Sequence, residues 1–218
     1  MFNKILFLLI ILAQTSLSFS QLSYSKKSFV TQDNPDVFER IVPKKNGFMR
    51  TYITATVTLW DIDDRKTTLI NYNSEVLLCI EGQYKKGQRE GIYNVFVLDS
   101  ADHSKKYKIW EQNYSNNKLN GEWKTFSLSG PLVEINNYKD DILSGTSKRF
   151  WINGNIIQER TFYSENNYLV KEYTREGIIK EETTILNDRP HGPAKKYYPN
   201  GTLMDEENFE NGILHGAR

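Results

Sequence analysis

The chain has 218 residues, with 28 Lys and Arg against 27 Asp and Glu, so its formal net charge is only +1. This balance argues against nucleic-acid binding and against strong electrostatic attraction to a membrane, both of which need a clear excess of basic residues. Its one cysteine, Cys79, has no intrachain partner, so we expect a buried thiol, with a disulfide to another chain as the alternative.

Residues 1–20 have the composition of a secretory signal peptide. Lys4 gives a positive start, residues 5–13 are apolar, and Ser18-Phe19-Ser20 forms a small-x-small cleavage site before Gln21. The apolar stretch is too short to span a membrane as a helix. We therefore expect an exported protein, in the periplasm, at the outer surface or secreted, with a retained membrane anchor as the alternative.

The next 62 residues contain the first predicted strands. Residues 21–50 are polar and without a clear period, which indicates an extended lead-in. Residues 51–60 alternate apolar side chains with Thr and so predict a strand with one buried face. A charged turn at 61–66 and two strands, 67–72 and 75–81, around Asn73-Ser74 follow. We expect residues 51–82 to form an N-terminal cap that covers the first edge of a larger sheet, a separate small β-domain being the alternative.

From residue 83 onward the chain repeats. Gly130, Gly154, Gly177 and Gly201 are spaced by 24, 23 and 24 residues, and each is placed to form a tight turn. A second series closes a longer turn, with spacings of 30, 24, 47 and 24 residues: Gly91, Gly121, Gly145, Gly192 and Gly216. Other columns keep this register, such as an aromatic or apolar residue seven positions before the closing glycine and a leucine two before it. A shared period of about 24 residues indicates a repeat protein.

Each copy is predicted to be one β-hairpin. Residues 146–152 form a strand, Asn153-Gly154 is a two-residue turn with positive φ at both positions, and residues 155–162 form the return strand. A lone hairpin is marginally stable, so the copies stack edge to edge and share an apolar face. The predicted fold is all-β, with tandem antiparallel hairpins in an elongated twisted sheet or an open solenoid.

Two copies depart from the period. Residues 97–106 are an insertion, expected in a loop on one side of the sheet. The copy at 163–185 lacks its closing glycine, so we expect a distortion or a longer loop near residues 166–170.

The last copy, K-Y-Y-P-N-G-T-L-M-D-E-E-N-F-E-N-G-I-L-H-G at residues 196–216, resembles the MORN repeat variant as it occurs in bacterial antitoxin-type proteins. The resemblance extends over about residues 84–218, taken here as the repeat domain 83–218. It implies a scaffold or partner-binding surface, and other repeats of this type suggest lipid-headgroup binding as the alternative. Four lysine pairs are the sequence support for that alternative: Lys26-Lys27, Lys85-Lys86, Lys105-Lys106 and Lys195-Lys196.

The sequence contains no catalytic motif of a hydrolase or nucleotide-binding enzyme. Carboxylates after the tight turns follow the repeat, whereas a catalytic pair would break it: Glu134, Glu159, Glu181 and Glu206. We expect no enzyme, no cofactor and no metal site. An enzyme acting on envelope glycan is the remaining alternative, with a pocket at residues 166–171 or 99–106.

Aromatic side chains recur in the first strand of successive copies. We expect these residues to pack in a core, and the alternative is an exposed strip that binds a partner or glycan. Six of them are the candidate binding residues: Trp123, Phe126, Phe150, Trp151, Tyr197 and Tyr198. Adjacent members must point to opposite faces of a regular strand. The predicted function is therefore a non-enzymatic, exported interaction or scaffold module of the cell envelope, related to antitoxin or immunity proteins.

Overall fold

A computed structural model of the protein describes residues 46–63 and 68–215, and within residues 55–75 only the backbone of the strands. The predicted signal peptide and most of the predicted lead-in lie outside the described residues.

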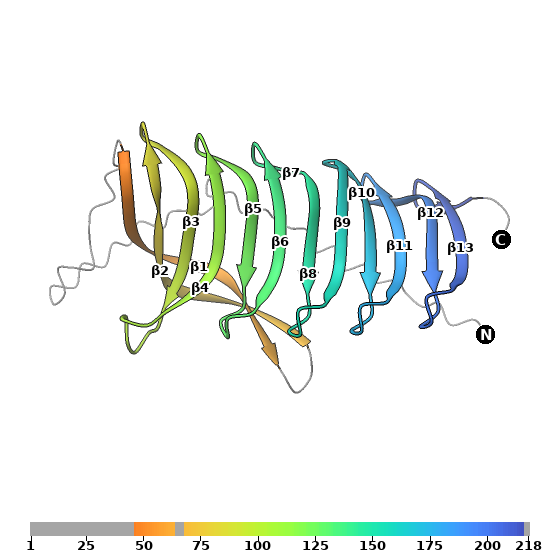
Figure 1. Ribbon diagram of the computed structural model, residues 1–218, viewed down its shortest axis with the longest axis horizontal. Helices are drawn as coiled ribbons and strands as arrows, with labels where there is room; N and C mark the ends of the chain where they lie inside the picture. The colour runs from red at the N-terminus through yellow and green to blue at the C-terminus, as the bar shows by residue number, and fades with distance from the viewer. Residues whose placement is uncertain (1–45, 64–67, 216–218) are drawn as a thin grey trace.

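The described residues form one open antiparallel sheet of 14 strands, and none of them is helical (Figure 1). Each strand pairs with its neighbours in sequence, except that the two-residue β7 pairs only with β6. The prediction of an all-β sheet of tandem hairpins is confirmed. The strands are β1 Asn46–Asp63, β2 Thr68–Lys85, β3 Gln88–Leu98, β4 Lys106–Ser115, β5 Lys118–Phe126, β6 Leu132–Lys139, β7 Ile142–Leu143, β8 Gly145–Phe150, β9 Ile156–Ser164, β10 Asn167–Tyr173, β11 Ile179–Leu186, β12 Arg189–Tyr197, β13 Leu203–Glu210 and β14 Ile213–Leu214.

Two kinds of turn alternate along the sheet, and their assignment differs from the prediction. The predicted two-residue turn at Asn153-Gly154 is wrong: only Gly154 has positive φ, at 84°. The Gly154 amide donates to the Trp151 carbonyl at 2.9 Å, and the Trp151 amide donates to the Asn155 carbonyl at 2.7 Å. The Asn153 side chain instead accepts a hydrogen bond from the Asn155 amide at 3.0 Å. Because its carboxamide satisfies the backbone, Asn153 does not need the left-handed conformation.

The two-residue turns lie at the opposite end of the strands, where a longer turn was expected. Asp140 and Asp141 have φ of 53° and 72°, the backbone of a type I′ hairpin turn. Four other turns share this pattern of two successive positive φ values: Lys86-Gly87, Asn116-Asn117, Asn187-Asp188 and Asn211-Gly212. The short acidic and amide side chains at most of these positions tolerate the left-handed region better than larger residues.

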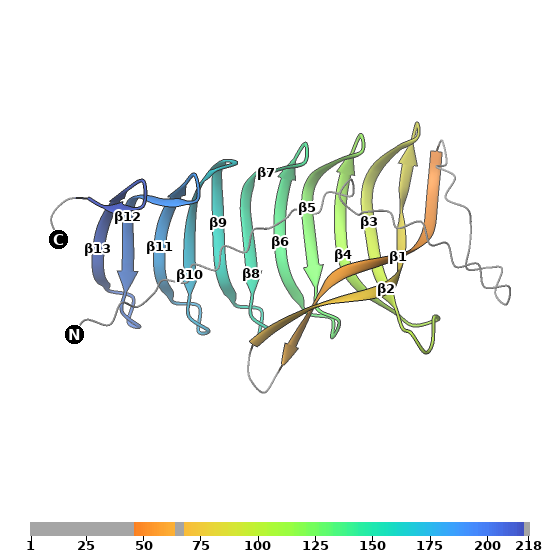
Figure 2. The same ribbon diagram turned by 180° about the vertical axis from the view of Figure 1, so that it is seen from behind.

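The first hairpin is longer than the sequence suggested. β1 begins at Asn46, inside the predicted lead-in, and β2 runs without a break through Asn73-Ser74, where a turn was predicted. The two strands pair over their full length, from Asn46 opposite Lys85 to Asp63 opposite Thr68, so the ladder of β1 holds Asn73 and Ser74 extended. The far half of this hairpin bends away and crosses one face of the sheet (Figure 2).

The core lies on the face that this hairpin approaches, in the first half of the sheet. Leu78, Val95 and Ile109 are at most 3% exposed, and Ile53 and Val76 from the hairpin pack against their cluster. Tyrosine rings extend the cluster, with Tyr93 and Tyr114 edge to face at 5.2 Å between ring centroids. We call this side of the sheet the core face.

Three of the repeated positions lie in one row on the core face: the closing glycine, the aromatic residue and the leucine. Tyr138 of β6 lies opposite Gly121 of β5 on one side and Leu143 of β7 on the other. The same glycine–aromatic–leucine order recurs at Gly91, Tyr114 and Leu119, and at Gly192, Phe209 and Leu214. A residue without a side chain leaves room for the ring opposite it, and the leucine packs on the ring's far side. This packing explains why the three residue types share one period.

Both irregular copies keep the strand order. The insertion lies in the loop between β3 and β4, as predicted. At the copy without a closing glycine, β9 and β10 are joined by only Glu165 and Asn166, and the register shifts between Asn167 and Tyr168. The predicted distortion is therefore present, as a bulge rather than a longer loop.

Candidate binding surface

The second face of the sheet carries a row of charged residues, whose sign alternates from Lys148 to Glu206. Residues directly opposite each other on paired strands share a face, so the pairing register traces this row from strand to strand. It runs across the sheet as Glu81, Asn94, Glu111, Lys124, Ile135, Lys148, Glu159, Lys171, Glu182, Lys195 and Glu206. We call these residues the charge row and this side of the sheet the binding face.

Neighbours in the charge row form ion pairs. Lys124 lies 3.2 Å from Glu111, and Lys148 lies 3.2 Å from Glu159. Lys171 and Glu182 are 3.6 Å apart, and Lys195 and Glu206 are 3.7 Å apart. Because each exposed pair is worth only about 0–1 kcal/mol, the row contributes more to the pattern of charge on the surface than to stability.

Carboxylates at the N-terminal part of the row remain ionised. Hydrogen bonds from Lys108 and then Lys124 lower the pKa of Glu111 below its ordinary value. Burial alone would raise the pKa of Glu81, but hydrogen bonds from Lys106 and Arg50, both at 2.8 Å, lower it overall. These groups act as fixed negative charges and not as proton donors near neutral pH.

An aromatic row runs beside the charge row. Each of its rings lies two residues after a charge-row residue in the same strand and therefore points to the same face. The rings are Phe96, Phe126, Phe150, Tyr173 and Tyr197, and the residues opposite them on the return strands are aliphatic in four copies: Leu132, Ile156, Ile179 and Leu203. All five rings are half-buried, so each keeps part of its surface available.

The structure brings together three of the six aromatic residues predicted from the sequence. Phe126, Phe150 and Tyr197 belong to the aromatic row, whereas Trp123 lies on the core face, with its ring centroid 5.8 Å from that of Tyr138. Trp151 and Tyr198 begin turns, where their amides donate to Asn155 and Thr202. The six residues therefore do not form one strip on one face, and their role in binding stays a prediction.

Two members of the row, Phe96 and Tyr173, were not among the predicted binding residues. The signal that identifies Tyr173 is the spacing from a lysine, because Lys171 precedes Tyr173 by two positions, just as Lys195 precedes Tyr197. Tyr173 was not assigned to the aromatic series because the copy that contains it lacks the closing glycine near residue 168. The closest link between the rows is a 2.6 Å hydrogen bond from the Tyr197 hydroxyl to Glu182, which raises the pKa of Tyr197 to about 12.

The recurring carboxylates do not converge on one site. Glu159 and Glu206 belong to the charge row, whereas Glu134 and Glu181 lie on the core face, opposite Arg149 and Lys196. Burial raises the pKa of Glu181, with Lys196 opposing the shift. Carboxylates on opposite faces of a sheet cannot act on one substrate, and Glu159 and Glu206 form ion pairs with Lys148 and Lys195.

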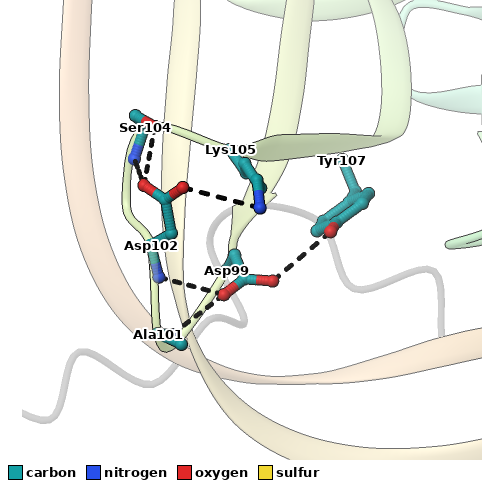
Figure 3. Close-up of polar contacts among 6 residues, drawn as sticks. All are labelled: Asp99, Ala101, Asp102, Ser104, Lys105 and Tyr107. Carbon is teal, nitrogen blue, oxygen red and sulfur yellow. Dashed lines mark hydrogen bonds and ion pairs between the residues drawn. The ribbon is translucent and has the colours of Figure 1, made fainter.

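The loop between β3 and β4 uses its own polar groups internally (Figure 3). Asp99 accepts hydrogen bonds from the amides of Ala101 and Asp102 at 2.9 and 3.0 Å, and the Tyr107 hydroxyl donates to it at 3.3 Å. The backbone donors lower the pKa of Asp99, so this carboxylate is a structural acceptor and a poor general acid. Asp102 likewise accepts hydrogen bonds from the amide and the hydroxyl of Ser104.

The lysine pairs in the described residues do not form a common basic face. Lys195 and Lys196 follow each other in β12 and point to opposite faces, where they lie 3.7 and 3.8 Å from Glu206 and Glu207. Lys106 is bound to Glu81 at 2.8 Å, and Lys105 lies 3.6 Å from Asp102. An anionic lipid headgroup would have to compete with these carboxylates.

Cys79 is 2% exposed, in agreement with the predicted buried thiol. Burial raises its pKa, so the thiol is protonated and unreactive near neutral pH. In residues 46–63 and 68–215, no three or more His, Cys, Asp or Glu side chains are grouped as metal ligands. Within the same ranges, no helix is long and apolar enough to cross a membrane.

The comparison with known protein families finds a match at the hairpin β12–β13. Residues 190–211 match the MORN repeat variant. The match covers one copy of the repeat and supports a MORN-repeat family, whose members are non-catalytic modules that generally mediate protein or membrane interactions. The antitoxin-type subclass stays a prediction. No curated protein matches the chain.

Proposed function

We propose that the protein is an exported, non-enzymatic interaction module of the cell envelope that holds a partner protein on the binding face. The aromatic row is the observation that carries this proposal. It places one half-buried ring per copy on the same side of the sheet, beside charges whose sign alternates from Lys148 to Glu206.

Such a surface suits a protein partner. Tyr and Phe supply large contact areas at a low cost in conformational entropy, and they are enriched at the centres of protein interfaces. Alternating charges fix the position of a partner along the sheet without attracting polyanions in general, because neighbouring charges cancel at a distance. The row also repeats from strand to strand, which favours an extended partner surface over a small ligand.

Affinity capture from an envelope fraction tests the proposal. Phe126 and Phe150 are replaced together by Ala in the tagged full chain, and Tyr163→Ala serves as the matched control, since Tyr163 is 62% exposed and lies outside the aromatic row. We expect the double variant to lose a specific partner that the wild type and the control both retain. A Phe150→Leu variant, which keeps an apolar side chain, separates loss of binding from loss of folding. Recovery of the same partner by a folded double variant would contradict the proposal.

Export is tested separately, by cell fractionation. The full chain is expected outside the cytoplasm and shortened by about the first 20 residues, whereas a chain lacking residues 1–20 is expected in the cytoplasm. The narrower proposal of an antitoxin-like or immunity function requires the captured partner to be an exported toxin that the protein neutralises. A captured structural protein of the envelope would support the scaffold function instead.

A further inference from the structure

We infer that the outer edge of β13 accepts an extended segment of a partner protein by strand addition, and that this segment carries the pattern Lys-x-Phe or Lys-x-Tyr. The inference rests on the proposed function, because it names where on the interaction module one partner segment is held. It is carried by a comparison of β13 with the equivalent strands inside the sheet.

The internal return strands show what normally lies beside this edge. Glu111, Glu159 and Glu182 occupy the position of Glu206 in earlier copies, and the strand that follows each of them places a lysine directly opposite. In the remaining copy Ile135 occupies this position, and it faces Lys148. The four following strands all carry an aromatic residue two positions after the lysine: Lys124-Thr125-Phe126, Lys148-Arg149-Phe150, Lys171-Glu172-Tyr173 and Lys195-Lys196-Tyr197.

β13 presents the same features with no strand beside them in the described residues. Glu206 has Lys195 on one side, at 3.7 Å, and its side chain is 48% exposed. Leu203 ends the aromatic row and is 49% exposed, whereas its equivalents Leu132, Ile156 and Ile179 are half-buried between two aromatic strands. A lysine facing Glu206 and a ring facing Leu203 would continue both rows by one strand.

The backbone of β13 is oriented to receive this strand. The Asn208 carbonyl points outward, because it accepts a hydrogen bond from the His215 amide at 2.7 Å. In an antiparallel ladder the residues two apart point the same way, so Glu206 also presents its amide and carbonyl to the outer edge. β14 pairs only with Phe209 and Glu210, so it leaves this stretch uncovered.

Charge complementarity selects a basic segment. β13 carries four carboxylates and no Lys or Arg: Asp205, Glu206, Glu207 and Glu210. Lysines of β12 form ion pairs with β13 from its inner side, as Lys195 does with Glu206. Four more exposed apolar side chains surround the edge, which gives an incoming strand apolar contacts as well: Tyr198, Met204, Ile213 and Leu214. Backbone pairing supplies affinity in such complexes, and side chains supply specificity.

A fluorescent peptide with the sequence of residues 145–151, Gly-Thr-Ser-Lys-Arg-Phe-Trp, tests the inference directly. Binding to the full chain is followed by fluorescence anisotropy, and hydrogen exchange locates the site. We expect saturable binding with slowed amide exchange at residues 204–208. Replacing the peptide's Lys by Glu or its Phe by Ser should weaken binding by about tenfold or more, the effect of losing one good contact.

Two controls isolate the strand geometry. N-methylation of the peptide's Lys removes the amide that would donate to β13, whereas N-methylation of its Arg alters an amide that points away from β13. We expect the first change to abolish binding and the second to preserve it. Equal effects of the two changes would overturn strand addition.

The charge contact is tested in the protein. Glu206→Lys should weaken binding of the Lys peptide and strengthen binding of the Glu peptide, while Glu210→Lys in the same strand should leave the preference unchanged. No binding of the Lys peptide, or equal binding of both peptides to the wild type, would overturn the inference. A dimer of the full chain that Glu206→Lys converts to a monomer would assign the edge to a second copy and would overturn it as well.

Partner capture with the two sets of variants distinguishes a failure of the edge inference from a failure of the proposed function. If Phe126→Ala with Phe150→Ala abolishes partner capture while Glu206→Lys does not, the binding face stands and the edge inference fails. If only Glu206→Lys abolishes capture, the edge holds the partner and the aromatic row does not.

Discussion

Tyr168 of β10 lies directly opposite Ile185 of β11, at the one copy of the repeat that lacks its closing glycine. In the neighbouring copies the same row pairs Gly145 with Phe162 and Gly192 with Phe209. In this copy the aromatic ring, Tyr168, takes the place of the glycine. The smaller side chain, Ile185, takes the place of the phenylalanine. Tyr168 also packs against Phe162 at 5.1 Å between ring centroids.

This exchange predicts coupling between Tyr168 and Ile185. Ile185→Phe alone places two rings opposite each other in a packed row and should cost about 1–3 kcal/mol in the free energy of unfolding. Tyr168→Gly alone removes a half-buried ring and should cost a similar amount. The double variant restores the arrangement of the other copies, so its loss should be smaller than the sum of the two. Urea denaturation of the four proteins measures this; additive losses would contradict the proposed exchange.

Gly82 should not tolerate a side chain. A Cβ at this position would lie 2.4 Å from the ring of Tyr93, and that ring is held by a 2.6 Å hydrogen bond from its hydroxyl to the Gln83 carbonyl. Gly82→Ala is expected to lower the free energy of unfolding by about 1–3 kcal/mol through overpacking. Adding Tyr93→Leu to Gly82→Ala should cost less than the two single changes together. The matched control is Gly154→Asn, which is expected to cost little because the turn is open and Asn tolerates positive φ.

The ion pairs of Glu111 predict part of the acid sensitivity of the sheet. Its pKa is lowered in the folded protein, chiefly by hydrogen bonds from Lys108 and Lys124. The ionised form therefore contributes stability above the pKa of the unfolded chain, and this contribution is lost as the pH falls through the lower folded pKa. Glu111→Gln should reduce stability at pH 7 and should lose less stability than the wild type between pH 7 and pH 3.

Urea denaturation at the two pH values measures this difference. Glu165→Gln, a change in an exposed turn, is the control and should follow the wild type. An equal loss of stability on acidification in Glu111→Gln and in the wild type would show that these lysines do not stabilise the carboxylate.

The link between the two rows on the binding face predicts a contrast between adjacent tyrosines. Tyr197 donates to Glu182 at 2.6 Å, whereas Tyr198 is 46% exposed. Tyr197→Phe should lower the free energy of unfolding by about 1.5–3 kcal/mol, the range for a hydrogen bond to a charged group, while Tyr198→Phe should be close to neutral. Thermal unfolding followed by circular dichroism compares them, and equal melting temperatures would argue against the bond in solution.

Much of the fold could be predicted from the sequence because the repeat is marked by glycines, which occur at turn positions that require positive φ. Gly130, Gly154, Gly177 and Gly201 all adopt positive φ and all lie in turns, so their spacing gives the length of the hairpins. The type of turn could not be predicted from Asn153-Gly154 alone. An Asn side chain can satisfy the turn by accepting a backbone hydrogen bond, and the sequence does not distinguish this from a left-handed Asn.

The candidate binding surface was predicted only in part. The sequence identified aromatic residues in register, but it grouped Trp123 with Phe126, and the two lie on opposite faces. The charge row was not apparent, since lysines and glutamates that lie side by side in the sheet are more than ten residues apart in sequence, as Lys124 and Glu111 are.

The sequence by itself determined the period, the hairpin unit and the antiparallel order, because backbone conformation at glycine and the alternation of side chains along a strand are local properties. Only the tertiary structure decided which side chains share a face. Most of the strand pairings contain a bulge, and a bulge shifts the alternation by one residue. The binding face and its open edge at β13 therefore follow from the pairing of all the strands, which no single stretch of the sequence contains.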